Sequence, residues 1–99
     1  MSVSVQTGEF DLAGELAELK SGRHDIGGIA AFVGTVRELA GGRPILSMTL
    51  EHFPGMTEAE LARIEAEAHR RWPLICSRIV HRHGVLRPGD DIVMVLTAS

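Results

Sequence analysis

The sequence is poor in the residue types that define several common classes of protein. It holds one cysteine, Cys76, one lysine, Lys20, and no tyrosine. A single cysteine excludes an intrachain disulfide and a multi-cysteine metal cluster. No apolar run approaches the roughly 18 residues of a membrane span, and the first residues lack the charged-then-apolar pattern of a signal peptide. We therefore expect a soluble, cytoplasmic protein.

Positive charge is also scarce. The chain has 10 Lys and Arg against 13 Asp and Glu, a net charge of −3. The basic residues are scattered, which argues against the basic stripe of a nucleic-acid-binding protein. The 99 residues, 44% of them hydrophobic, suit one compact domain over 1–99 and leave no room for two cores.

Two helices are predicted from capping and breaking residues. Asp11 is a suitable N-cap for the first helix, and Gly22 a suitable stop. In the second, Thr57 and Glu60 have the spacing of a capping box, and Pro73 ends the helix. The expected apolar stripe of this second helix comprises Leu61, Ile64, Ala68 and Trp72. Its spacing predicts that Trp72 belongs to the core.

The remaining segments read as strands. They are 2–6, 27–37, 45–53, 75–83 and 91–98. The segment 27–37, GGIAAFVGTVR, is apolar on both faces, which predicts a central strand covered on both sides. Strands mixed with helices in this order predict an α+β fold, with a mostly antiparallel sheet and helices packed on one face.

Arg37 is the first candidate for chemistry. It ends the glycine-rich predicted strand and precedes the loop LAGGRP. A guanidinium at such a place binds phosphate or carboxylate bidentately, which an ammonium group does less well. The alternative is an arginine that only marks where the strand meets water.

Three histidines are the second candidate. His81 and His83 are two residues apart on a predicted strand, and His52 ends another. Converging imidazoles bind zinc or copper, although no acidic or cysteine partner stands at ligand spacing. Glu51 and His52 are adjacent on a strand, so alternation separates them and disfavours an acid/base pair. Cys76 is expected to be an inert buried thiol.

Three stretches together resemble one family, the large, catalytic subunit of molybdopterin synthase. They are GGIAAFVGTVR, LEHFPGMTEAELARIEAEAHRRWP and IVHRHGVLRPGDDIVMVLTAS, and they cover most of 27–99. The resemblance implies an α/β-hammerhead type of fold and a homodimer of large subunits. Each would bind a small ubiquitin-like sulfur carrier whose C-terminal Gly-Gly ends in a thiocarboxylate, which makes a heterotetramer. Two sulfurs would enter cyclic pyranopterin monophosphate, with no cofactor.

The resemblance also assigns residues. The substrate-contacting segment of the family matches Thr35, Val36 and Arg37, with Arg37 holding the substrate phosphate. Thr35 stands where such enzymes often carry lysine. His83 fills the variable place of the HR-x-G stretch, which weakens a metal role. The catalytic lysines of the family would lie beyond Ser99, so we expect this chain to lack the C-terminal part.

Two other functions stay open at this stage. A non-catalytic α+β module would keep the dimer and partner surfaces without the lysines. A small histidine metal-binding domain would use His52, His81 and His83. We also expect self-association, because a final strand without a following helix leaves an apolar face uncovered.

Overall fold

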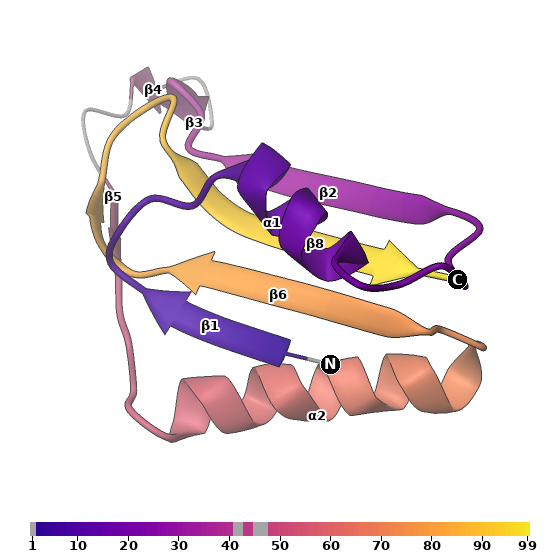
Figure 1. The fold of residues 1–99 in the computed structure, drawn as a ribbon. Helices are drawn as coiled ribbons and strands as arrows, with labels where there is room; N and C mark the ends of the chain where they lie inside the picture. The colour runs from indigo at the N-terminus through magenta and orange to yellow at the C-terminus, as the bar shows by residue number, and fades with distance from the viewer. Residues whose placement is uncertain (1, 41–42, 45–47) are drawn as a thin grey trace.

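Two helices and a four-stranded sheet dominate the computed structural model, which describes residues 2–40, 43–44 and 48–99. The helices are α1, Leu12–Lys20, and α2, Met56–Arg71. The sheet contains β1, Ser2–Gln6; β2, Ile29–Thr35; β6, Cys76–Arg82; and β8, Asp91–Ala98. Two short pairs are β3, Leu39–Ala40, with β4, Arg43–Pro44, and β5, Met48–Leu50, with β7, Gly84–Leu86 (Figure 1).

The strand order of the sheet is β1-β6-β8-β2. β1 runs parallel to β6, whereas the other two pairs are antiparallel. The predicted α+β fold with a mostly antiparallel sheet is thus confirmed. The core lies on one face of the two central strands, where the fully buried Val80, Met94 and Leu96 meet Leu16 and Leu19 of α1.

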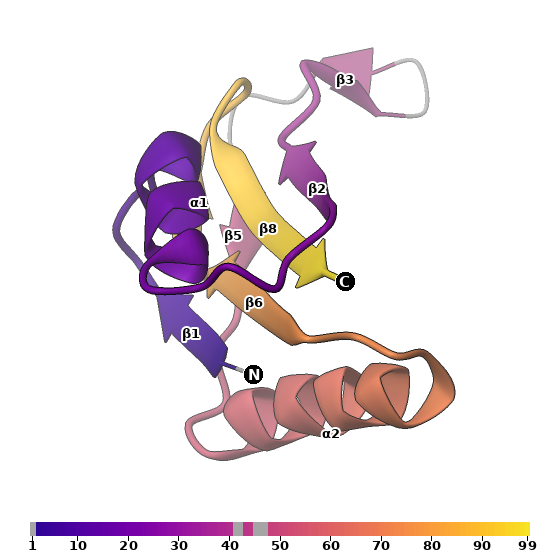
Figure 2. The same cartoon turned by 45° about the vertical axis from the view of Figure 1, so that its right-hand side comes forward.

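The two helices cover opposite faces of the sheet, and the prediction of a single helical face is wrong. On β6, Arg78 pairs with Glu15 of α1, whereas the hydroxyl of its neighbour Ser77 bonds to Glu65 of α2. Successive residues of a strand point to opposite faces, so these two contacts separate the helices. Figure 2 shows α1 and α2 on different sides of the sheet, with α2 beside the edge strand β1.

The prediction of a doubly covered central strand at 27–37 is also wrong. Within the described part of the chain, β2 pairs only with β8 and is an edge strand. Phe32 leaves 62% of its surface exposed, and Ala30 and Ala31 are exposed as well. Small apolar residues give this segment its hydrophobic character, but their side chains carry little area to bury. The apolar character of 27–37 therefore reflects its small residues and does not indicate that the strand is buried.

Helix α2 begins earlier than predicted. Its N-cap is Gly55, and the Glu58 carboxylate accepts the Gly55 N–H at 2.6 Å. The capping box predicted from Thr57 to Glu60 is therefore wrong, and Glu58 makes only half of such a box, because Gly55 has no side chain that could accept a bond in return. The Thr57 hydroxyl instead accepts the N–H of Phe53 at 3.2 Å. The predicted end of the helix before Pro73 is confirmed, and in the last turns Glu67 pairs with Arg71 at 2.8 Å.

Trp72 is 56% exposed, so its predicted place in the core is wrong. It caps α2 in an extended conformation, outside the last helical turn. The residue that α2 buries most deeply is Glu65, which is 4% exposed. Its carboxylate accepts the Ser77 hydroxyl at 2.5 Å and the Ser2 N–H at 3.1 Å. These polar contacts set the rotation of the helix.

Other strand predictions are confirmed in part. The segments 2–6 and 91–98 are strands, and 75–83 is a strand up to Arg82. Of the predicted strand at 45–53, Met48–Leu50 forms β5, and 45–47 lie outside the described residues. The two-residue strands and β7 were not predicted. No helix in the described part of the chain is long and apolar enough to cross a membrane.

Candidate functional site

The three residues assigned by resemblance lie together where β2 ends beside the start of β8. Thr35 is the last residue of β2 and pairs with Asp91 across a bulge in the register. Thr35 and Arg37 are exposed, whereas Val36 is 3% exposed. The Arg37 guanidinium is therefore open to an anionic ligand. Val36 cannot present its side chain there, because it is used in packing.

The turn that follows β7 is hydrogen-bonded to the segment Thr35–Arg37. We call it the 87–90 turn. The Asp90 carboxylate accepts the Arg87 N–H at 2.9 Å, and the Asp90 N–H donates to the Arg87 carbonyl at 2.9 Å. Gly89 has a φ of 90°, a conformation that residues with a Cβ rarely adopt. The backbone of this turn is fixed by a side chain from within it.

Both backbone groups of Val36 bond to the 87–90 turn. The Val36 N–H donates to the Asp90 carbonyl at 2.9 Å, and the Val36 carbonyl accepts the Gly89 N–H at 2.9 Å. Gly34, just before it, has no room for a side chain, since an added Cβ would lie 2.9 Å from Val93 Cγ1. The backbone just before Arg37 is therefore closely packed at Gly34 and hydrogen-bonded at Val36.

Arg82, the last residue of β6, bonds to the start of β8, next to the 87–90 turn. It is 9% exposed, and its guanidinium donates to the Thr7 carbonyl at 3.0 and 3.2 Å and to the Asp91 carbonyl at 3.1 Å. A buried guanidinium is costly unless it is hydrogen-bonded, and these carbonyls supply the acceptors. Arg82 was not predicted as a site residue, although it belongs to the stretch HRHGVLRPGD that resembles the family.

The histidines do not converge as a set of three. The rings of His52 and His83 lie 4.3 Å apart between centroids, whereas His81 Nδ1 bonds to the Arg82 carbonyl at 2.8 Å. His52 Nε2 bonds to Glu58, which the sequence did not indicate as a partner. Across the described ranges, no group of three or more potential metal ligands gathers.

Glu58 is the carboxylate of this histidine cluster. Its hydrogen bond with His52, followed by the backbone N–H of Gly55, holds the pKa of Glu58 below its ordinary value of 4.5. The lowered pKa means that these contacts favour the charged carboxylate. The pair therefore ties the first turn of α2 to the segment after β5, away from the 87–90 turn.

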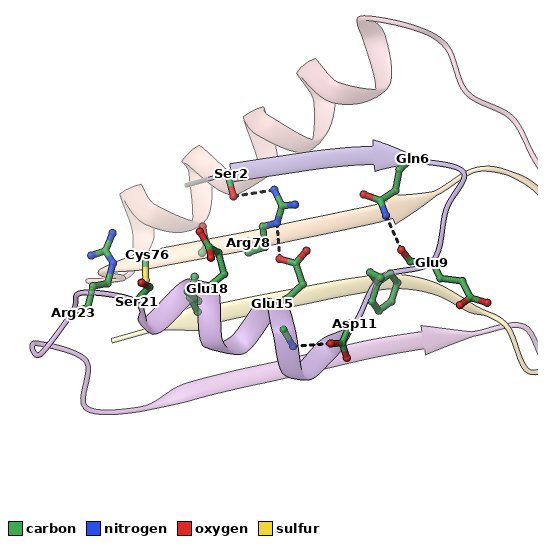
Figure 3. Close-up of a pocket in the computed structure, with 14 residues that line it drawn as sticks. Ser2, Gln6, Glu9, Asp11, Glu15, Glu18, Ser21, Arg23, Cys76 and Arg78 are labelled. Atoms are coloured by element: carbon green, nitrogen blue, oxygen red, sulfur yellow. Dashed lines mark hydrogen bonds and ion pairs between the residues drawn. The ribbon is translucent and has the colours of Figure 1, made fainter.

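A cavity of about 800 Å³ lies elsewhere, between α1 and strands β1 and β6 (Figure 3). Its charged lining residues are Glu9, Asp11, Glu15, Glu18, Arg23 and Arg78. Arg78 is paired with Glu15 at 3.0 Å and bonds to the Ser2 hydroxyl at 3.1 Å. Carboxylates outnumber guanidinium groups here, so the cavity does not suit an anionic substrate. Thr35, Val36 and Arg37 do not line it.

Cys76 lines this cavity at the start of β6 and is 3% exposed, which confirms the predicted buried thiol. Lys20, in the last turn of α1, is exposed, as its helical position predicted. Neither residue lies among the partners of the segment Thr35–Arg37, so the site depends on arginine for its positive charge.

The fold and the segment at the end of β2 define the class: an α+β protein with an exposed, backbone-braced arginine suited to an anion. The family model described as MoaE protein matches residues 5–99. The chain therefore belongs to the MoaE family.

Relatives and solved structures agree with this assignment. The molybdopterin synthase catalytic subunit of Ralstonia nicotianae is 49% identical over 99% of this chain and 56% of its own length. That of Pseudomonas aeruginosa is 48% identical over 100% of this chain and 66% of its own length. The molybdopterin biosynthesis MoaE protein of Burkholderia ambifaria has a TM-score of 0.89 and 51% identity, over 99% of this chain and 63% of that one.

More distant structures share the fold. The molybdopterin synthase of Staphylococcus aureus has a TM-score of 0.84 at 27% identity, covering 97% of this chain and 69% of that one. A complex of subunits 1 and 2 of the molybdopterin-converting factor of Helicobacter pylori has a TM-score of 0.70 at 16% identity, over 98% and 64%, and shows the fold alone. The chain spans 56% of the length of the Ralstonia relative, little more than half.

Proposed function

We propose that this chain acts as the catalytic subunit of a cytoplasmic molybdopterin synthase, in the biosynthesis of the molybdenum cofactor. The observation that carries the proposal is the match of the MoaE family to residues 5–99, together with the exposed Arg37 at the braced end of β2. Sulfur passes from the C-terminal thiocarboxylate of a small ubiquitin-like subunit to cyclic pyranopterin monophosphate. Two such transfers give the dithiolene, and water returns each carrier to a carboxylate.

Arg37 binds the phosphate of the pterin in this proposal. Its guanidinium forms two parallel charge-assisted hydrogen bonds with phosphate oxygens. Thr35, exposed one residue before the buried Val36, supplies a neutral hydroxyl in reach of the same anion. Because Val36 is buried and its backbone is fully bonded, it contributes by holding its two neighbours in place.

The proposed partners are a small subunit and a second large subunit. The Helicobacter pylori structure is a complex of subunits 1 and 2 of a molybdopterin-converting factor, which supports a second, small subunit as the partner. We propose that the small subunit places its Gly-Gly tail beside Arg37, and that two large subunits form the centre of a heterotetramer. The lysines that would assist sulfur transfer belong to the part of the family that follows position 99.

Titration with the thiocarboxylated small subunit, followed by addition of the pterin, tests the proposal. A catalytic subunit that includes the part after position 99 forms the complex and yields dithiolene product, and Arg37→Ala in that subunit keeps the complex but loses product. Complex formation without product from the wild-type chain would support the non-catalytic module instead, a reading that the catalytic relatives do not favour. Neither complex nor product would contradict the proposed function.

A further inference from the structure

We propose that the 87–90 turn is a positioning device for Arg37, with Gly89 and Asp90 as its positioning residues. The inference rests on the proposed function, because it assumes that Arg37 binds an anion. It explains a stretch of sequence, LRPGD, to which the site residues themselves assign no role. The turn contacts the residue before Arg37 and leaves the guanidinium open.

The first step is the immobility of Val36. Its side chain is 3% exposed, and both its N–H and its carbonyl bond to the turn at 2.9 Å. A residue held at its side chain and at both backbone groups has one conformation. Arg37 is the next residue, so the place of its Cα is set by the two residues that hold Val36, Gly89 and Asp90.

The second step is the closure of the turn itself. Asp90 contributes its carbonyl to Val36 and its carboxylate to the Arg87 N–H, both at 2.9 Å. Gly89 contributes its N–H at a φ of 90°, and an added Cβ there would meet nothing within 4 Å. A substitution at Gly89 therefore changes the backbone conformation without creating a clash.

The third step is the demand of the ligand. A bidentate contact between guanidinium and phosphate needs the planar fork in one orientation, since geometry as well as charge supplies its strength. Arg82 holds the residue directly after the turn, by donating to the Asp91 carbonyl at 3.1 Å. Loosening the turn at Gly89 should therefore weaken anion binding at Arg37 while the charge of the site stays the same.

The variants are Gly89→Ala and Asp90→Ala, each with a matched control, and Asp90→Asn as the conservative variant. Asp90→Asn keeps a side-chain oxygen for the Arg87 N–H and should rescue the loss. Gly22→Ala imposes the same kind of strain, since Gly22 has a φ of 69° and open space around it, away from the 87–90 turn. Asp11→Ala removes another capping carboxylate, which accepts the Gly14 N–H at 3.2 Å. Denaturant unfolding confirms that each variant folds.

Two NMR measurements at Arg37 test the positioning role. The first is the heteronuclear NOE of the backbone N–H and of the side-chain Nε–Hε group. The second is the chemical-shift change of the Nε–Hε signal during titration with inorganic phosphate. Gly89→Ala and Asp90→Ala should lower the NOE and weaken phosphate binding at least threefold. Asp90→Asn, Gly22→Ala and Asp11→Ala should leave both unchanged. An unchanged NOE and affinity in Gly89→Ala and Asp90→Ala would overturn the positioning role.

The same titration separates this inference from the proposed function. If the Arg37 signal of the wild-type chain does not respond to phosphate, the anion-binding role of Arg37 fails, while the NOE still tests the turn. If phosphate binds in the wild type, as followed at the Thr35 amide, and is lost in Arg37→Ala, the role of Arg37 holds. Unchanged Gly89→Ala and Asp90→Ala would then reject the positioning role alone.

Discussion

At the scale of single residues, Glu65 carries an unusual share of the stability. Its buried carboxylate accepts the Ser77 hydroxyl and the Ser2 N–H. The Ser77 hydroxyl has one hydrogen, so His69 Nε2–H must donate to its oxygen at 2.8 Å. This chain of hydrogen bonds joins α2, β6 and the first strand. Removing the carboxylate takes the acceptor away from the buried Ser77 hydroxyl.

Glu65→Ala should therefore lower the free energy of unfolding by about 1–3 kcal/mol. The matched control is Glu60→Ala on the same helix, which removes only an exposed pair with Arg63 and should therefore cost less. Urea unfolding of the two variants measures the difference. Equal effects from both substitutions would show that the buried carboxylate contributes no more than a surface one.

Arg37 could be proposed from the sequence, and its role stays a prediction, whereas Trp72 was misplaced and Glu65 was overlooked. An arginine at the end of a glycine-rich strand is a local signal. The orientation of α2 depends on Ser77 and Ser2, which lie 12 and 63 positions from Glu65. Local periodicity carries no information about such partners, so the helix was expected to bury its apolar stripe. The contacts of Val36 and Arg82 were hidden in the same way.

At the scale of elements, the start of α2 should respond to pH. The lowered pKa of Glu58 means that the unfolded chain binds more protons below the ordinary value of 4.5. Its contribution to stability is therefore present above pH 4.5 and lost as the pH falls through the folded-state pKa. The stability difference between the wild type and Glu58→Gln should shrink as the pH falls from about 6 to about 3.

Denaturant unfolding at a series of pH values measures this difference. His52 supplies the first cause of the lowered pKa, so His52→Ala is the matched background. In that background Glu58→Gln should show a smaller dependence on pH. A difference between wild type and Glu58→Gln that stays constant across the range would refute the coupling of the cap to His52.

Element types were largely predictable, whereas element neighbours were not. The helices were located from local capping and breaking residues, and the main strands from hydrophobic runs. The edge position of β2 and the pairing of β5 with β7 are properties of the sheet. They follow from which segments meet in space, which one sequence does not encode locally.

At the scale of the whole molecule, the exposed face of β2 should mediate the proposed homodimer. Phe32 is 62% exposed, and β2 is an edge strand among the described residues. Exposed apolar groups on an unpaired edge favour association. Phe32→Ser should shift the sedimentation coefficient toward the monomer. Val85→Ser, at a residue 67% exposed on β7, is the control and should leave association unchanged. A wild-type monomer at high concentration would contradict the dimer.

The most direct test of the central claim is a calorimetric titration of the chain with cyclic pyranopterin monophosphate. Loss of one charge-assisted bidentate contact predicts binding about 10- to 100-fold weaker in Arg37→Ala, with Arg37→Lys between it and the wild type. Arg23→Ala, which removes an exposed guanidinium from the cavity beside α1, should bind as the wild type does. Equal affinities of the wild type and Arg37→Ala would contradict the claim that Arg37 holds the substrate.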